Sequence, residues 1–302
     1  MEKAELGVVT SSEVVVLNRG NSTTCTVNLH GATIVSWKVF NIEQLFVSTE
    51  SRFDNLFPIR GGISIIYTQF GFDNIFMPNN GFARTSHWSV EEHPTVIRDG
   101  DVKAVFVLKS DLVMRENYWP FDFVLKFIVV LQEQSLNLKL SIYNGERDMP
   151  VKCNIAFMNY LRLTRSENCA ISGLKDFNCL DRISKKIVCE TRDSFNVDHW
   201  IDNVYHMAGR DIHLSNSVLP FSMKISRWNL PDVGFWNPWT DAVHLATCLC
   251  EEEVKQMIVV VNGSILSPCV VPPLSWYSVN QLMEAIYDRE IYSDRSASLS
   301  IL

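Results

Sequence analysis

Apolar and polar residues alternate along much of this chain. Four aliphatic residues between positions 136 and 142 are separated by polar ones, and this period of two predicts a strand with one buried face. A β-branched and aromatic run at 123–131 precedes it, and Gln132-Glu133-Gln134 between the two predicts a hairpin turn. Further short apolar runs that predict strands lie at 25–29, 105–108, 155–163, 221–226 and 257–261.

Turn-forming residues separate these runs, and they include Asn144-Gly145, Asp99-Gly100 and Pro231-Asp232. No amphipathic helix of three or more turns is evident, and no Gly/Ser tract or charge block divides the chain. Many short strands with turns between them are typical of a sandwich or barrel. We therefore predict one all-β domain over residues 10–285 with hardly any helix, followed by a polar C-terminal tail over 286–302.

Composition narrows the classes of function. The 302 residues carry 27 basic and 34 acidic side chains, a net charge of −7 that argues against a nucleic-acid-binding track. No apolar stretch approaches about 18 residues, so no transmembrane segment is expected. Hydrophobic residues make up 47% of the chain, which indicates either a large core or apolar surface for a protein partner. The eight cysteines form no CxxC pair, so we expect reduced thiols, no metal site and no cofactor.

Several short motifs follow one another in a fixed order. The most informative are Ile59-Arg60-Gly61-Gly62-Ile63 and Gly81-Phe82-Ala83-Arg84. The others are His30-Gly31-Ala32-Thr33-Ile34-Val35-Ser36-Trp37-Lys38, Gln69-Phe70-Gly71, Trp119-Pro120-Phe121-Asp122-Phe123, Ser172-Gly173-Leu174, Asp202-Asn203-Val204-Tyr205 and Phe235-Trp236-Asn237-Pro238-Trp239. Over residues 25 to 285 this series resembles the hexose-6-phosphate mutarotases (glucose-6-phosphate 1-epimerases) of the aldose-1-epimerase family. The resemblance implies a galactose-mutarotase-like β-supersandwich.

The resemblance also implies a chemistry. Opening a sugar ring requires a base at the anomeric hydroxyl and an acid at the ring oxygen. The family carries the acid as a His in a segment like "ALHTYF" and the base as a Glu in one like "VCVE-x-G". Here the first segment, 156–161, has Met158 at the acid position, and the second, 258–263, is interpreted with Asn262 at the base position. Neither a thioether nor an amide transfers a proton near neutral pH. Asn80 also replaces the His that usually precedes the "GFAR" motif.

An alternative is that the comparison slips by one or two residues, or that neighbouring residues substitute. Asn159 and Tyr160 are poor acids, and a slip of one residue turns a side chain to the other face of its strand. The acidic run Glu251-Glu252-Glu253 is more typical of a solvated turn. His206 follows the Asp202 motif and could enter the site, although a lone His is more often a structural residue.

Part of a binding site is retained in the sequence. By the resemblance, Arg60 and Arg84 hold the phosphate of the substrate, Asp202 accepts a sugar hydroxyl, and Asn79 lies near the sugar. The guanidinium group suits phosphate because it donates two parallel hydrogen bonds. Alternatively, each arginine pairs with a carboxylate and only closes the sandwich. The segment 64–68 lacks two prolines of the family, so we expect a relaxed loop that presents the arginines poorly.

Two classes of function follow. The first is a non-catalytic structural subunit: the chain resembles the mutarotase-like members of subcomplex B of the plant chloroplast NAD(P)H dehydrogenase-like complex, which serves cyclic electron flow around photosystem I. This implies protein partners in a membrane-attached complex and a location on the stromal side of the thylakoid membrane, with a presequence absent from this chain. The alternatives are a hexose-6-phosphate 1-epimerase, or a sugar-phosphate sensor that binds without turnover.

Overall fold

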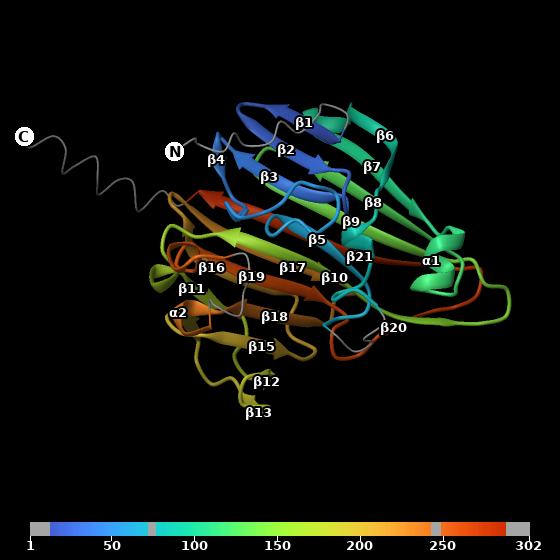
Figure 1. Cartoon of the computed structure of the whole chain (residues 1–302). Helices are drawn as coiled ribbons and strands as arrows, with labels where there is room; N and C mark the ends of the chain where they lie inside the picture. Colours follow the sequence, from blue (N-terminus) through green and yellow to red (C-terminus); the bar gives the residue numbers. More distant parts are fainter. Residues whose placement is uncertain (1–12, 72–76, 243–248, 288–302) are drawn as a thin grey trace, which may run out of the picture.

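Two large β-sheets, which pack face to face, make up the fold in a computed structural model that describes residues 13–71, 77–242 and 249–287 (Figure 1). The first sheet has twelve strands. Its main path is β1 (Val14–Gly20), β2 (Thr23–Asn28), β3 (Thr33–Val39), β5 (Ile63–Thr68), β10 (Val151–Arg162), β19 (Met257–Gly263), β18 (Asp232–Asn237), β15 (Ile201–Tyr205), β12 (Asn178–Asp181) and β13 (Lys186–Cys189). Two short strands lie off this path, β4 (Ile42–Glu43) beside β3 and β20 (Cys269–Val271) beside β10.

The second sheet has nine strands. Their order is β14 (Ser194–Asn196), β11 (Ala170–Ser172), β16 (Asp211–Val218), β17 (Phe221–Trp228), β21 (Trp276–Tyr287), β9 (Ser135–Asn144), β8 (Phe123–Leu131), β7 (Val102–Lys109) and β6 (Ser89–Val96). The helices in the described part of the chain are short: α1 (Leu112–Asn117), α2 (Trp239–Ala242), α3 (Glu251–Val254), and the 3₁₀ turns η1 (Ala83–Thr85), η2 (Arg98–Gly100) and η3 (Ser166–Asn168). The prediction of an all-β sandwich with hardly any helix is therefore confirmed.

The hairpin that the alternating pattern predicts at residues 123–144 is present. Strands β8 and β9 pair from Phe123↔Asn144 to Leu131↔Leu136, so residues 132–135 make the turn. Every second side chain of β8 is buried between the sheets. Phe127 of β8 meets Phe157 of β10 with ring centroids 5.9 Å apart, which joins the two sheets. Burying an aromatic side chain of this kind contributes about 1.5–3 kcal/mol.

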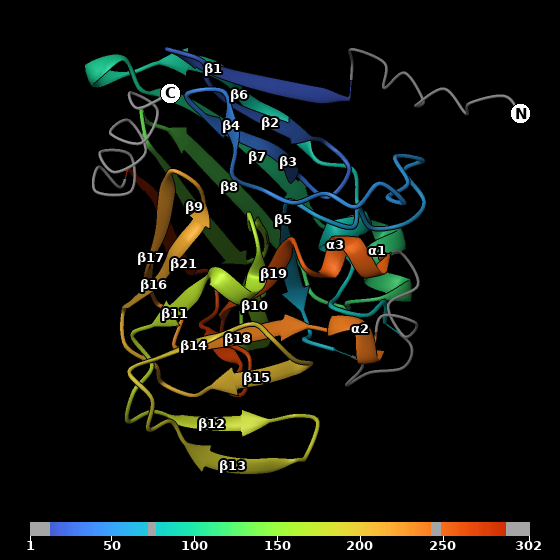
Figure 2. The same ribbon diagram turned by 90° about the vertical axis from the view of Figure 1, so that its left-hand side faces the viewer.

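A second apolar cluster lies on the other face of the twelve-stranded sheet. Figure 2 shows β16, β17 and β21 on one side of β10 and β19, and helices α2 and α3 on the other. The cluster contains residues of β5, β10, β15 and β19 together with Val254 of α3. The central strands of this sheet are therefore buried on both faces, which explains why β19 reads as a continuous apolar run rather than an alternating one.

One predicted loop is wrong. The segment 64–68, which lacks the family's prolines, belongs to the central strand β5, and all six residues of that strand are buried. It pairs with β10 over six positions, from Asn154↔Thr68 to Asn159↔Ile63. Because the ladder and the burial hold this backbone, the missing prolines do not leave a relaxed segment. The strand leads directly from Arg60 into the sheet.

Glycines in the two most informative motifs permit close backbone packing. Gly62 has φ +65°, and a Cβ added there would lie 2.0 Å from the carbonyl oxygen of Ile34. Gly81 has φ +75°, and a Cβ there would lie 1.8 Å from the carbonyl oxygen of Tyr67. Only glycine fits such contacts. Both glycines thereby fix the segments that carry Arg60 and Arg84 against the sheet.

The end of the domain differs slightly from the expected boundary. Strand β21 continues through Ile286 and Tyr287, which had been assigned to the tail, and pairs with β17 as far as Phe221↔Tyr287. Residues 288–302, which make up the rest of the predicted tail, lie outside the described residues. None of the helices described is long and apolar enough to cross a membrane.

Candidate functional site

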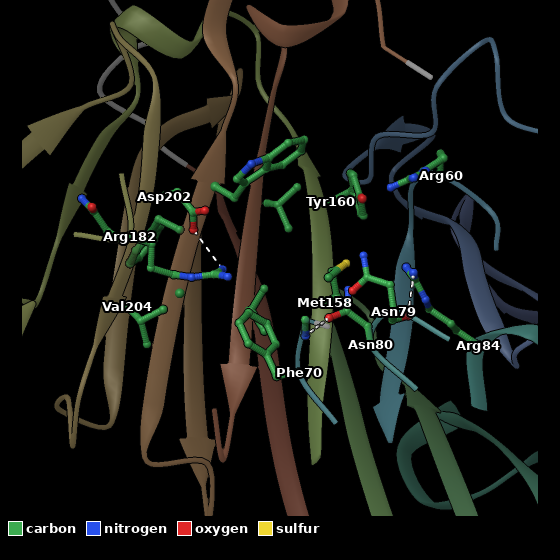
Figure 3. Close-up of a pocket in the computed structure, with 17 residues that line it drawn as sticks. Arg60, Phe70, Asn79, Asn80, Arg84, Met158, Tyr160, Arg182, Asp202 and Val204 are labelled. Carbon is green, nitrogen blue, oxygen red and sulfur yellow. Dashed lines mark hydrogen bonds and ion pairs between the residues drawn. The ribbon is translucent and has the colours of Figure 1, made fainter. Parts of the chain in front are cut away.

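A pocket of about 310 Å³ opens on the face of the twelve-stranded sheet that points away from the second sheet (Figure 3). A volume of this order suits a small organic ligand. Strands β10, β19, β18 and β15 line it, together with Arg60 and the segments around residues 70–71 and 79–84. The side chain of Arg182, which follows β12, completes it.

The floor of the pocket is apolar where β10 meets β19. These strands are antiparallel, with Met158 opposite Val261 and Tyr160 opposite Val259. All four residues line the pocket, as the period of two along each strand requires. Met158 therefore occupies the pocket position that the resemblance implies for the acid. Its pocket-facing partner on β19 is Val261.

The interpretation of Asn262 as the base position is corrected by this register. Asn262 is fully buried on the opposite face of β19, where its Nδ2 donates to Oε1 of Gln281 at 2.6 Å. It is not among the residues that line the pocket. The reason is the slip of one residue: when "VCVE-x-G" is aligned on Gly263, its glutamate falls on Val261. Neither the amide of Asn262 nor the side chain of Val261 transfers a proton near neutral pH, so neither alignment gives the chain a base at this position.

The residues that could replace the missing acid or base lie in different parts of the structure. Asn159 faces the core and bonds Gln281, whereas Tyr160 lines the pocket. His206 does not line the pocket; its Nδ1 lies 2.8 Å from Oδ1 of Asp232, a fully buried carboxylate. Glu253 of the acidic run accepts hydrogen bonds from residues 48 and 49 and so holds α3 in place.

Two arginines form one wall of the pocket. Arg84 is 6% exposed; its Nη2 donates to the carbonyl oxygen of Asn79 at 2.9 Å, and its Nε has no hydrogen-bond partner among the described residues. Burial lowers the pKa of Arg84 to about 10, Tyr160 opposes this shift, and the nearby charge of Arg60 adds to it. Within the described residues, neither Arg60 nor Arg84 has an ion pair with a carboxylate. Both guanidinium groups are therefore available for an anion.

The two asparagines beside these arginines have different roles. Asn79 lines the pocket, and its buried Oδ1 has no partner within the described part of the chain. Asn80, which stands where the family usually has a His, accepts a hydrogen bond from the backbone N–H of Gly71 at 2.7 Å and is 7% exposed. Asn80 thus holds the turn that carries Phe70 over the pocket.

The opposite wall carries an ion pair. Nη1 of Arg182 donates to Oδ1 of Asp202 at 3.2 Å, and its guanidinium carbon lies 5.3 Å from the ring centre of Phe70. Burial raises the pKa of Asp202, and the charge of Arg182 partly offsets that shift. Figure 3 shows this pair across the pocket from Arg60 and Arg84, with Met158 between. Arg182 was missed by sequence reasoning because no family motif contains it and it lies twenty residues before Asp202.

Of the two tryptophans in the motif at 235–239, Trp236 lines the pocket and Trp239 does not. Trp236 also packs against the second apolar cluster, so it combines a core role with a surface suited to stacking on a sugar ring.

The pocket is positively charged in an acidic protein. Its described lining contains three arginines and one carboxylate, although the whole chain carries a net charge of −7. Clustered guanidinium groups in a partly closed cavity attract anions. The arrangement therefore fits a small negatively charged ligand.

Proteins similar to this chain match it over most of its length. The family model of aldose 1-epimerase matches residues 13–275. The chain belongs to the aldose 1-epimerase family. A protein of Cenchrus ciliaris named "Putative glucose-6-phosphate 1-epimerase" is 27% identical over 270 residues, which cover 86% of this chain and 81% of that protein.

Solved structures of similar proteins show the same fold. YeaD of Salmonella typhimurium, described as a "putative mutarotase", superimposes with a TM-score of 0.80 at 21% identity over 88% of each chain. Slr1438 of Synechocystis superimposes with a TM-score of 0.76 at 17% identity, over 91% of this chain and 96% of its own. The predicted galactose-mutarotase-like β-supersandwich is therefore confirmed. Within this epimerase fold, the present chain has methionine and valine at the two central pocket positions.

Proposed function

We propose that this member of the aldose 1-epimerase family is non-catalytic and works as a subunit of a larger assembly, the chloroplast NAD(P)H dehydrogenase-like complex on the stromal side of the thylakoid membrane. The observation that carries the non-catalytic part is the pair Met158 and Val261 at the centre of the pocket. Ring opening needs a donor and an acceptor of protons on either side of the sugar, and each is worth about 10²–10⁴ in rate.

The role as a subunit rests on the resemblance and is supported by the surface. Strand β13 ends the twelve-stranded sheet, and all four of its residues are exposed, Ile187 by 72% and Val188 by 51%. An edge strand of this kind presents backbone N–H and C=O groups that a strand from another protein pairs with. Leu112 and Val113 of α1 add exposed apolar area, at 74% and 64%.

Anomer exchange of glucose 6-phosphate tests the non-catalytic part. Exchange NMR with and without purified protein should give the same rate constant, because spontaneous ring opening proceeds in water without help. Asp202→Asn and Tyr160→Phe are the informative variants, since these residues also line the pocket. A rate enhancement that survives further purification and falls in either variant would establish a rewired epimerase, which is the alternative function.

Fractionation tests the assembly. Thylakoids and stroma from a plant source, separated on native gels and probed with an antibody to this chain, should place the protein in a large membrane-attached complex. Migration near the monomer mass of 34.5 kDa in the stromal fraction would overturn the subunit role.

A second candidate function is the binding of a sugar phosphate without turnover. It is favoured by Arg60 and Arg84, which face the pocket with no carboxylate partner among the residues described. Calorimetric titration with glucose 6-phosphate should show binding that Arg84→Met removes, while glucose alone should not bind. The two functions are compatible, because β13 and the pocket use different surfaces of the sheet.

A further inference from the structure

Two buried cysteines lie opposite each other where β20 pairs with the start of β10 (Figure 1). The register places Cys153 directly across from Cys269, and their Sγ atoms lie 3.6 Å apart. Cys153 is 2% exposed and Cys269 is 8% exposed. Of the cysteines that the structure describes, these are the only two whose sulfur atoms are in contact.

Burial alone accounts for other thiols of the core. Cys25 and Cys169 are fully buried and fill space as small apolar side chains. Desolvation raises the pKa of both, which keeps them protonated and unreactive. Cys153 and Cys269 differ from them, because each has a second thiol within reach.

The backbone at this pair already meets the requirement for a disulfide. Directly opposite residues of antiparallel strands have Cα atoms about 4.5 or 5.5 Å apart, depending on the hydrogen-bonding pattern. Both values lie within the roughly 4.4–6.8 Å that disulfides span. To form the bond, the sulfur atoms must approach from 3.6 Å to about 2 Å, which is a movement of the side chains rather than of the strands.

The two thiols are not equivalent. The S–H of Cys269 donates to the backbone carbonyl oxygen of Cys153 at 3.2 Å, so the S–H of Cys153 is the donor in the contact between the sulfurs. That second hydrogen bond lowers the pKa of Cys269, although burial opposes the shift. Cys269 is also the more exposed of the two, on a strand of three residues whose partner in the described sheet is β10. An oxidant therefore reaches Cys269 first, with Cys153 in place as the resolving thiol.

We propose that Cys153 and Cys269 form a reversible redox site, which hydrogen peroxide closes to a disulfide and a dithiol reductant reopens. In the first step the sulfur of Cys269 attacks the peroxide, the O–O bond breaks, and Cys269 becomes a sulfenic acid as one water leaves. In the second step the sulfur of Cys153 attacks that sulfenic acid, the S–O bond breaks, and a second water leaves with the thiol proton. The two cysteines lose two electrons, and the peroxide gains them. A dithiol reverses the reaction by thiol–disulfide exchange and is itself oxidised to a disulfide.

The disulfide has a defined structural consequence. It joins β20 to β10 covalently and closes a loop that contains β12, β15, β18 and β19 of the same sheet. The two cysteines are 116 positions apart, and closing so long a loop restricts the unfolded chain, so the oxidised protein should resist unfolding more strongly. Neither cysteine is among the described lining residues of the pocket, so this inference is independent of the proposed binding of a sugar phosphate.

Oxidation of the purified full chain tests the site. The protein is reduced, freed of reductant and treated with hydrogen peroxide; thiols are then alkylated in denaturant, and peptides are mapped by mass spectrometry without reduction. We expect a peptide pair that joins Cys153 to Cys269, and its loss when the folded protein is treated with dithiothreitol. Cys25 and Cys169, buried in the same sample, should remain alkylated thiols. The unfolding temperature of the oxidised protein should rise by about 5 °C or more.

Variants test the order of attack and the specificity. Cys189→Ser combined with Cys250→Ser removes the two exposed thiols of the described chain, and it should preserve both the disulfide and the temperature rise. Cys153→Ser removes the resolving thiol, so Cys269 should stop at a sulfenic acid that dimedone traps. Cys269→Ser leaves the less exposed Cys153, which should trap far less dimedone. Thermal unfolding of the reduced variants verifies that they are folded, and mapping of the unaltered protein decides the proposal without them.

Three results would overturn parts or all of the proposal. If Cys153 and Cys269 both remain thiols at a peroxide concentration that fully oxidises Cys189, the redox site does not exist. If the disulfide forms but dithiothreitol leaves it intact in the folded protein, the site is not reversible. If the unfolding temperature of the oxidised protein is unchanged or lower, closure strains the strands and does not fasten β20 to β10. Equal trapping of dimedone by the two single variants would show that the order of attack is wrong.

Discussion

Met158 and Val261 lie directly opposite each other on antiparallel strands, and both side chains face the pocket. Opposite residues on neighbouring strands have Cβ atoms about 4.5–5.5 Å apart, so two groups there act on the same small ligand. In this chain that place holds a thioether and an isopropyl group. The pocket therefore has charged side chains along its sides, whereas Met158 and Val261 at its centre cannot transfer protons.

Restoring proton-transfer groups at positions 158 and 261 tests whether their absence prevents catalysis. We expect Met158→His combined with Val261→Glu to accelerate anomer exchange of glucose 6-phosphate at least about tenfold over the unaltered protein, measured by exchange NMR. The matched control combines Met158→His with Asn262→Glu. That glutamate points into the core, so the control should give no acceleration and should unfold at a lower temperature. Equal activity of the two double variants would contradict the register of β19.

The buried guanidinium group of Arg84 should lower the free energy of unfolding, although it contributes to the binding of a sugar phosphate. Its lowered pKa reflects burial without a carboxylate partner among the described residues, and such burial is unfavourable. We expect Arg84→Met to raise the free energy of unfolding by about 1–3 kcal/mol and to weaken binding of glucose 6-phosphate. Urea unfolding and calorimetry measure the two effects. A destabilised Arg84→Met protein would indicate that the charge is compensated.

A polar cluster between the sheets should be sensitive to substitution. Gln281 of β21 accepts from Asn262 at 2.6 Å and donates to Asn159 at 2.7 Å, and all three side chains are fully buried. Gln281→Leu leaves two buried amides without these partners, so we expect a loss of about 2–4 kcal/mol in urea unfolding. Glu284→Gln, on the same strand but partly exposed, is the control and should change stability little. A neutral Gln281→Leu would show that water replaces the missing partner.

Acid should weaken the protein through Glu190. The hydrogen bond from Arg192 lowers the pKa of Glu190 to about 2 from an ordinary 4.5, and Tyr205 adds a further bond. Between those two pH values the unfolded chain binds more protons, so stability falls as pH falls from 4.5 towards 2. We expect Glu190→Gln to lose about 1–2 kcal/mol at pH 7, after allowance for solvent screening.

The difference between Glu190→Gln and the unaltered protein should then shrink as the pH falls through that range. Urea unfolding at pH 7, 4 and 3 measures it, with Asp193→Asn as a control, because that carboxylate is 87% exposed. A constant difference at all three pH values would mean that the contact does not depend on the charge of Glu190.

Much of the fold was predictable from local pattern. The period of two at 136–142 determined which face of β9 is buried, because successive side chains of a strand point to opposite faces. The run at 257–261 was harder to interpret, since β19 is buried on both faces and shows no alternation. For that reason the burial pattern of β19 gave no signal against the one-residue slip that placed Asn262, rather than Val261, at the base position.

The candidate site was predictable only in part. Arg60, Arg84, Asn79 and Asp202 came from family motifs, and the structure brings all four to one pocket. Arg182 did not, because its place depends on the pairing of β12 with β15, which carries the turn after β12 over to Asp202. Pairing between strands distant in sequence leaves no local signal.

By itself the sequence determined many of the strands and their buried faces where polar residues alternate. These follow from interactions between residues that are neighbours along the chain. Only the tertiary structure decided that valine rather than asparagine faces Met158, and that a third arginine faces the other two. Both depend on the register between strands, which the packing of the whole sheet determines.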